Sequence, residues 1–248
     1  MTARTTAGSR RSSVQQATHF DGSTMLGIAD NMVFSTGDVD FWAYAVVRPT
    51  NVAADGNQPL FFKQTSDPVI SPTREYGLII YDTPPRNFEF DVYQTNNNGA
   101  GSAVSAALVG NNGIYVVQLW HDKTADKVWI QVNGNAANSG NTTAAPADSA
   151  AGFTVGGNDF GADSGHKLTG DLGPLFWAKT IPSAAERAYM SQPRYYNEIV
   201  RDQPSLAATF LAAYNGELNA SNGWTDLIGS SHLTLLRGTP TTVTAPWL

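Results

Sequence analysis

The residues best suited to chemistry lie in one short segment, Asn87–Tyr93, in which apolar and polar side chains alternate. Glu89 and Asp91 are two positions apart, and on a β-strand such side chains point to the same face. Retaining glycosidases use two carboxyl groups about 5–5.5 Å apart, one as the nucleophile and one as the acid/base. The alternative is that Glu89 and Asp91 are solvated residues of an exposed sheet face. The segment therefore predicts either an acidic sugar site or an ordinary polar surface.

Three aromatic side chains are candidates for contacting a sugar ring. In the alternating segment Val39–Val47, Trp42 and Tyr44 lie on the face opposite the core-facing set, and in Lys127–Val132 the same holds for Trp129. Sugar rings stack on such side chains through their apolar C–H faces while nearby polar groups bind the hydroxyls. The alternative is that a sandwich carrying a helix and long loops buries aromatic rings on both faces. The complete candidate glycan-binding set is Trp42, Tyr44, Glu89, Asp91, Tyr93 and Trp129.

Other patterns of catalytic and metal-binding residues are missing from the sequence. The chain has no cysteine, which excludes disulfides, thiolate metal sites and thiol nucleophiles. Its four histidines lie in separate segments without the spacing of zinc ligands, and no Gly-x-Ser-x-Gly segment is present. The segment Asn158–Asp163 offers oxygen ligands for calcium, although ordinary Asx turns account for its composition as well. We expect no metal and no cofactor, with calcium as the alternative.

Composition favours an all-β protein that does not bind nucleic acid. Charged residues make up only 15% of the 248 residues, which disfavours charged amphipathic helices, while the hydrophobic fraction of 42% is enough for one large core. The net charge of −6 gives no broad attraction for a phosphate backbone. No segment approaches the roughly 20 apolar residues that a membrane span requires.

Short alternating segments bounded by Gly, Asn, Asp and Pro predict strands from residue 17 onward. A helix is predicted to begin after Ser183, because Ser183 and Glu186 have the spacing of a capping box, and to end before Pro193. Ser205–Tyr214 is ambiguous by periodicity, and its context favours a strand at its end. We predict one domain over residues 17–248, a two-sheet antiparallel jelly-roll sandwich with one short helix near 183–192. The main strand predictions are Val39–Val47, Gly77–Tyr81, Asn87–Tyr93, Ile114–Trp120 and Lys127–Val132.

Residues 1–16 form a polar, weakly basic arm that contains Arg4, Arg10 and Arg11. Its composition is typical of disorder, and such arms fray unless another surface holds them. The arm contains no apolar run of the kind found in a secretory signal. We expect it to contact other protein subunits in an assembly, most simply copies of the same chain.

Taken together, these segments resemble a known family, the laminin-G-like branch of the concanavalin A-like lectin/glucanase superfamily. The resemblance covers nearly the whole chain after residue 17 through the order and spacing of its motifs. The segments that carry it are His19–Ser23, Thr36–Trp42, Trp120–Asp122, Ile130–Gly134, Leu172–Lys179, Ser183–Arg187, Leu211–Tyr214, Leu218–Ser221 and Asp226–Leu233. The resemblance implies two stacked antiparallel sheets that bind ligands or partners at the concave face or at the loop rim. Similar domains act as glycan-binding modules, adhesion domains, glycanases and outer components of phage particles.

The chain departs from this family where acidic residues are expected. The glucanase branch has a Glu-x-Asp-x-Glu strand, and here Tyr93 replaces the third acid. Leu218-Asn219-Ala220 stands where relatives often have Leu-Asp-Glu, and Gly170-Asp171-Leu172 lacks the usual acidic pair. We therefore predict a non-catalytic surface protein of a larger assembly, such as a decoration protein of a phage capsid, located on a virion surface or outside the cell. The alternative is a free glycan-binding module, and glycoside hydrolysis is the least favoured function.

Overall fold

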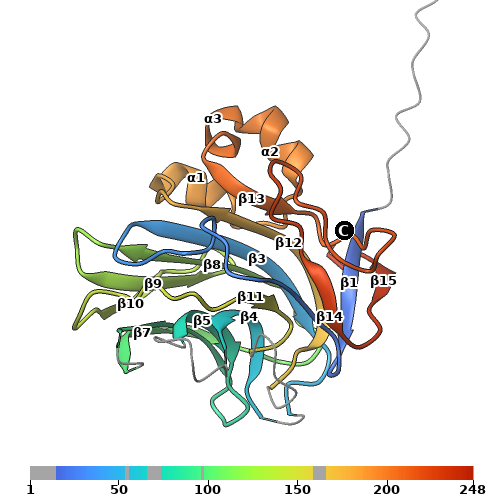
Figure 1. Ribbon diagram of the computed structural model, residues 1–248, viewed down its shortest axis with the longest axis horizontal. Coiled ribbons are helices and arrows are strands. Elements are labelled where there is room, and N and C mark those ends of the chain that lie inside the picture. The colour runs from blue at the N-terminus through green and yellow to red at the C-terminus, as the bar shows by residue number, and fades with distance from the viewer. Residues whose placement is uncertain (1–14, 54–55, 66–73, 96–97, 159–165, 248) are drawn as a thin grey trace, which may run out of the picture.

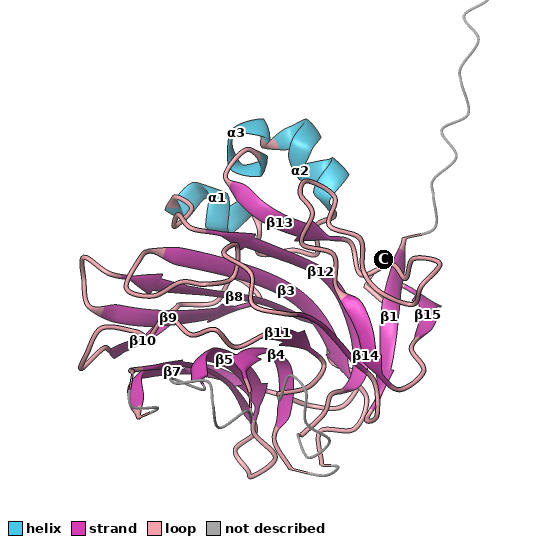
Figure 2. Cartoon of the chain, viewed as in Figure 1, coloured by secondary structure: helices cyan, strands magenta, loops and turns pink. Residues whose placement is uncertain are grey.

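The computed structural model describes residues 15–53, 56–65, 74–95, 98–158 and 166–247. In these ranges the chain forms two antiparallel β-sheets stacked face to face, with three short helices on one outer side (Figure 1, Figure 2). The predicted jelly-roll sandwich is confirmed. None of the helices in the described ranges combines the length and apolar character that crossing a bilayer demands.

The larger sheet has eight strands, and every paired neighbour in it is antiparallel. Seven strands follow one another in the order β10-β9-β8-β3-β12-β1-β15, and β13 pairs with β12 alongside that path. Its strands are β1 (Gln16–Asp21), β3 (Phe41–Pro49), β8 (Tyr115–Asp122), β9 (Lys127–Val132), β10 (Asn138–Asn141), β12 (Thr169–Ala178), β13 (Phe210–Tyr214) and β15 (Thr241–Thr244).

The smaller sheet has seven strands in the order β14-β2-β11-β4-β5-β6-β7, also antiparallel throughout. Its strands are β2 (Met25–Ile28), β4 (Gln58–Gln64), β5 (Arg74–Ile80), β6 (Asn87–Tyr93), β7 (Gly99–Leu108), β11 (Phe153–Val155) and β14 (Thr234–Arg237). Both sheets mix strands from distant parts of the sequence, so that most pairings are long-range.

The main core lies between the two sheets and follows from the alternation of side chains along the strands. In β3, Phe41, Ala43, Ala45 and Val47 face this core, as predicted. Val39 does not, because it precedes the strand and is 39% exposed. Every second residue of an inward-facing strand contributes to one shared apolar layer.

Three helices cover the outer face of the larger sheet: α1 (Ala184–Tyr189), α2 (Tyr196–Asp202) and α3 (Pro204–Ala207) (Figure 1). The predicted capping box of α1 is present, because the Ser183 hydroxyl accepts from the Glu186 N–H and the Glu186 carboxylate accepts from Ser183. The sequence prediction included α1 but not α2 and α3. In the ambiguous segment Ser205–Tyr214, β13 occupies the second half, as expected from context.

A second core fills the space between these helices and the larger sheet. Trp42 and Tyr44 are fully buried there, as are Phe176 and Ile199, and the nearly buried Phe210 packs with them. The Trp42 indole N–H donates to Gln118 at 3.3 Å, and the Tyr44 hydroxyl donates to the backbone carbonyl of Gln192 at 2.9 Å. Both rings are therefore buried and do not form a sugar-binding surface. This outcome agrees with the alternative that the sandwich buries aromatic rings on both faces of the sheet.

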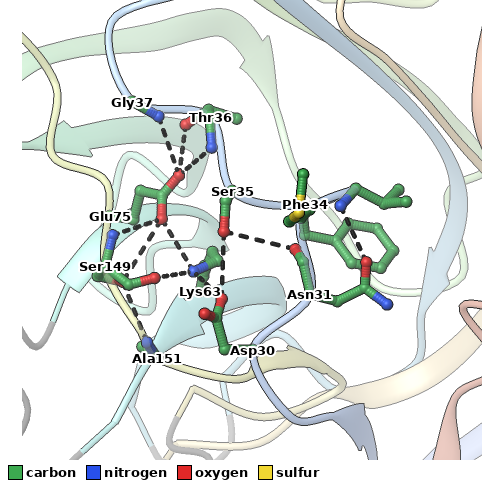
Figure 3. Close-up of polar contacts among 12 residues, drawn as sticks. Asp30, Asn31, Phe34, Ser35, Thr36, Gly37, Lys63, Glu75, Ser149 and Ala151 are labelled. Carbon is green, nitrogen blue, oxygen red and sulfur yellow. Dashed lines mark hydrogen bonds and ion pairs between the residues drawn. The ribbon is translucent and has the colours of Figure 1, made fainter.

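A buried ion pair ties the long segment around residues 30–37 to the sheet that it covers (Figure 3). Lys63 on β4 and Glu75 on β5 have no exposed side-chain surface, and the Lys63 Nζ lies 3.0 Å from Glu75 Oε2. Lys63 also contacts Asp30 Oδ1 at 3.0 Å and donates to the Ser149 carbonyl. The Glu75 carboxylate in turn accepts from Thr36, Gly37 and Ser149. Buried charges require this degree of compensation.

Candidate functional site

A polar pocket of about 190 Å³ opens on the outer face of the smaller sheet, over β4, β5 and β6. This is the face that points away from both cores, because Phe88, Phe90 and Val92 of β6 face the sandwich interior and the residues between them face outward. Most of its lining comes from the three strands, and Asn57, Asn158 and His166 complete the rim. The lining residues are Asn57, Pro59, Phe62, Gln64, Arg74, Ile79, Tyr81, Asp91, Tyr93, Asn158 and His166.

A glycine in the middle of β5 lets the Phe62 side chain, which lines the pocket, lie across that strand. Phe62 on β4, Gly77 on β5 and Asp91 on β6 are direct neighbours in one row across the sheet. A Cβ atom on Gly77 would lie 2.1 Å from the Phe62 ring, so the ring covers the position that any larger residue would occupy. A glycine inside a strand often marks a place where another group approaches the backbone closely. Here the approaching group is the Phe62 ring, which lies over Gly77 and lines the pocket together with Asp91.

The two acids of β6, Glu89 and Asp91, lie side by side on this face and interact electrostatically. Burial, and next the neighbouring charge of Glu89, raise the pKa of Asp91 to about 7. Glu89 also accepts a hydrogen bond from the Ser102 hydroxyl on β7, and its carboxyl group is the main cause of the raised pKa of Tyr81. Two carboxylates in contact cannot both ionise readily, so the pair holds a proton near neutral pH.

Aromatic and cationic groups form the other wall of the pocket. The Arg74 guanidinium lies 5.5 Å from the centre of the Tyr93 ring and is hydrogen-bonded to the Tyr93 hydroxyl. Burial, and next the Asp91 charge, raise the pKa of Tyr93 to about 12, so its hydroxyl stays protonated. The pocket thus combines carboxyl acceptors, a guanidinium donor and phenol rings within one hollow.

The predicted site residues fall in four different places. Asp91 and Tyr93 line the pocket, and Glu89 lies beside them in contact with Asp91. Trp42 and Tyr44 lie in the second core under the helices, and Trp129 is half-buried on the outer face of the larger sheet. The fourth place is the N-terminal arm, whose residues Arg4, Arg10 and Arg11 lie outside the described residues. The assembly role and the homo-oligomer therefore stay predictions.

Several pocket residues were missed by the sequence reasoning. Arg74, Tyr81 and His166 come from three separate segments and have no short-range pattern that joins them. Gly77 carried a readable signal, because it interrupts the apolar run of β5 opposite the acidic pair. The pairing of β5 with β6 places Gly77 opposite Asp91, and the local sequence does not reveal that pairing.

The calcium alternative falls mostly outside the described residues, because only Asn158 of the segment Asn158–Asp163 is described. Its side-chain Oδ1 is buried and has no hydrogen-bond partner among the described residues. No cluster of three or more His, Asp or Glu side chains suited to a metal ion occurs in the described ranges.

Replacing Asp91 by asparagine is expected to stabilise the protein at alkaline pH and to leave it unchanged in acid. The pKa of Asp91 is raised on folding, so between about pH 4 and pH 7 the folded state holds a proton that the unfolded state releases. Stability from this group is therefore present in acid and lost as the pH rises through 7. We expect Asp91→Asn to be more stable than wild type by more than about 1 kcal/mol near pH 8, and equal to it near pH 4.

Urea unfolding at the two pH values, followed by tryptophan fluorescence, measures this difference. Asp202→Asn is the matched control, because Asp202 is on α2 and its pKa is lowered, first of all by its hydrogen bonds from Arg201. A constant stability difference between Asp91→Asn and wild type across the pH range would contradict the shared proton.

Comparisons with known proteins place the fold but not a family. No family model matches the chain, and no curated protein sequence matches it. Among solved structures, a candidate carbohydrate-binding protein from Bacteroides ovatus superposes with a TM-score of 0.60 at 16% identity over 94% of this chain and 60% of its own. The present chain thus spans about three fifths of the length of that protein.

Two further structures share the same architecture at similar distance. A heptameric SAP-like pentraxin from Limulus polyphemus has a TM-score of 0.56 at 8% identity over 94% of this chain and 97% of its own. The CBM40 domain of the Ruminococcus gnavus IT-sialidase, bound to α2,3-sialyllactose, has a TM-score of 0.53 at 12% identity over 72% and 98% of the two chains. At these identities the likeness establishes the jelly-roll fold, and function has to be argued from the site.

Proposed function

We propose that the protein is a glycan-binding module that holds one end of a saccharide in the pocket over Gly77. The observation that carries the proposal is the convergence of Asp91, Tyr93 and Arg74 in the lining of that pocket. Sugar recognition combines an aromatic ring against the apolar C–H face with planar polar groups that bind adjacent hydroxyls. The structural neighbours with carbohydrate-binding names support the same class of ligand.

The size of the pocket favours a terminal sugar over an extended chain. At about 190 Å³ it is smaller than the roughly 300–1,000 Å³ typical of sites for drug-sized ligands. The charges around the pocket also nearly cancel. Arg74 carries one positive charge, and the acid pair carries one negative charge because it shares a proton. We therefore expect a neutral sugar, such as a non-reducing terminal hexose, to bind here.

The arrangement of the two acids favours binding over hydrolysis. Retaining glycosidases keep their carboxyl groups about 5–5.5 Å apart and inverting ones about 6.5–9.5 Å, so that the glycosidic bond lies between them. Glu89 and Asp91 interact electrostatically, and Tyr93 stands where the glucanase pattern has its second glutamate, so this strand lacks the full catalytic acid set. The acid pair can still accept hydrogen bonds from neighbouring sugar hydroxyls.

A glycan array followed by calorimetry tests the proposal. We expect wild type to bind a family of glycans that share one neutral terminal sugar. Near pH 8, Asp91→Asn should weaken binding by roughly ten- to a hundredfold, because it replaces a charged acceptor by a neutral amide. Asp202→Asn, on the helix-covered side, should bind as wild type does.

A blank array, or equal affinity for Asp91→Asn and Asp202→Asn, would count against the proposed site. A separate assay for reducing ends released from β-glucans and galactans addresses hydrolysis. We expect no release, and release by wild type but not by Glu89→Gln would replace the binding module with a hydrolase.

A further inference from the structure

A second hollow, of about 410 Å³, lies on the opposite outer face of the sandwich. It is formed where the turn after β9 meets α1 and the residues that follow that helix. Gln131, Asn133 and Gly134 line it from the β9 side, and Arg187 and Ser191 line it from the helix side. Asn133 and Gly134 both have positive φ, which makes this turn tight and brings Gly134 against Ser191. None of its lining residues belongs to the pocket over Gly77.

Arg187 is the charged group of this hollow. Its guanidinium stacks on the Trp120 ring at 4.5 Å from the ring centre and donates one hydrogen bond to the Pro182 carbonyl. None of the ion pairs among the described residues includes Arg187. Partial burial lowers the pKa of Arg187, as expected of a cation that has lost water without gaining an anion. A stacked guanidinium keeps its remaining N–H groups in a fixed plane that suits a carboxylate.

Gln131 supplies an unsatisfied acceptor at the same place. Its side-chain N–H₂ donates to the Asn135 carbonyl at 2.8 Å, which fixes the orientation of the amide. The amide oxygen is buried and has no hydrogen-bond partner in the part of the chain that is described. An unpaired buried acceptor costs free energy that a donor from a ligand recovers. A hydroxyl group is the donor that fits beside a guanidinium, because a second cation would be repelled.

Next to Gln131, Trp129 adds an aromatic surface on the same face of β9. The two residues are two apart on the strand, and the Trp129 ring stacks on Trp120 at 5.7 Å with an interplanar angle of 9°. The Trp129 indole N–H is also buried without a partner among the described residues. The stacked pair adjoins the hollow through Trp120, on which Arg187 packs, and the Lys127 ammonium lies 5.4 Å from the centre of the Trp129 ring.

We propose that this hollow is a second saccharide site, specific for acidic sugars whose carboxylate binds Arg187 and whose hydroxyl donates to Gln131. The site goes beyond the proposed function, since it lies on the other face and selects a charged ligand where the first pocket selects a neutral one. A neutral sugar leaves the Arg187 guanidinium without an anion, and a bare oxyanion leaves Gln131 without a donor. Only a ligand that carries both groups satisfies the hollow.

The test uses glucuronate, glucose and sulfate as probes, with the indole N–H signals of the tryptophans followed by NMR. We expect glucuronate to shift the Trp129 and Trp120 signals saturably, and glucose and sulfate to have at least about tenfold lower affinity. Arg187→Gln should weaken glucuronate binding by at least about tenfold, and Arg187→Lys should retain part of it. Gln131→Met should weaken glucuronate binding without creating affinity for sulfate.

Arg194→Gln is the matched control, because Arg194 also stacks on an aromatic ring, 4.4 Å from the centre of Tyr189, but does not line the hollow. It should bind glucuronate as wild type does, and so should Asp91→Asn, which separates this site from the first pocket. Equal binding of glucuronate by Arg187→Gln and Arg194→Gln would overturn the proposal, as would equal affinity for glucuronate and glucose or for glucuronate and sulfate.

Discussion

Replacing Lys63 by methionine is expected to lower the free energy of unfolding by roughly 3–5 kcal/mol, because it leaves the Glu75 carboxylate buried without its cation. Both side chains are fully enclosed, and Lys63 is the shared partner of Asp30, Glu75 and the Ser149 carbonyl (Figure 3). Water cannot reach the freed carboxylate to replace the lost contact. Urea unfolding near pH 7 measures the loss.

The control for this experiment is another lysine in an ion pair that is open to solvent. Lys123 lies 3.3 Å from Asp38, and both side chains are well exposed. Lys123→Met should cost less than about 1 kcal/mol, since exposed pairs contribute little. The double variant Lys63→Met/Glu75→Gln removes both buried charges and should be more stable than Lys63→Met alone. If Lys63→Met lowered the free energy of unfolding as little as Lys123→Met does, the buried ion pair would not stabilise the fold as we expect.

Truncating Trp177 to alanine is expected to cost roughly 3–5 kcal/mol, the range for a large aromatic residue removed from a close-packed core. Trp177 is fully buried on β12 at the centre of the aromatic cluster of the main core. Its ring stacks on Phe41 at 5.2 Å and on Tyr76 at 5.0 Å, so its loss removes contacts with both sheets at once. Urea unfolding measured by circular dichroism detects the change without relying on tryptophan fluorescence.

Trp177→Phe separates the volume of the ring from its polar group. The Trp177 indole N–H is buried and has no hydrogen-bond partner in the described ranges, so phenylalanine removes an unsatisfied donor together with part of the ring. We expect this substitution to cost less than half as much as Trp177→Ala. If Trp177→Phe and Trp177→Ala lowered the free energy of unfolding by the same amount, the ring that phenylalanine keeps would contribute nothing. That result would contradict the role given to ring packing at this position.

The strands could be predicted because one side of each faces an apolar core. Alternation placed Phe41, Ala43 and Ala45 in the main core, and the spacing of Ser183 and Glu186 placed the start of α1. Alternation could not show what covers the other side. Trp42 and Tyr44 point outward from their sheet as the pattern requires, but the helices that bury them come from residues more than 130 positions away.

The candidate pocket was predictable only in part, for a related reason. Asp91 and Tyr93 share a strand with Glu89, so their common face follows from local periodicity. Arg74 and Gly77 belong to the neighbouring strand, and their position beside β6 depends on the register between β5 and β6. Register is decided by the packing of the whole sheet, which a single sequence does not reveal.

The central claim is that the outer face of the smaller sheet binds a sugar, and a crystal structure of the protein with the best neutral glycan from the array tests it most directly. We predict a terminal sugar in this pocket, against the Phe62 and Tyr93 rings and within hydrogen-bond distance of the Asp91 carboxyl group. A glycan bound anywhere else on the molecule, with this pocket empty, would contradict the account.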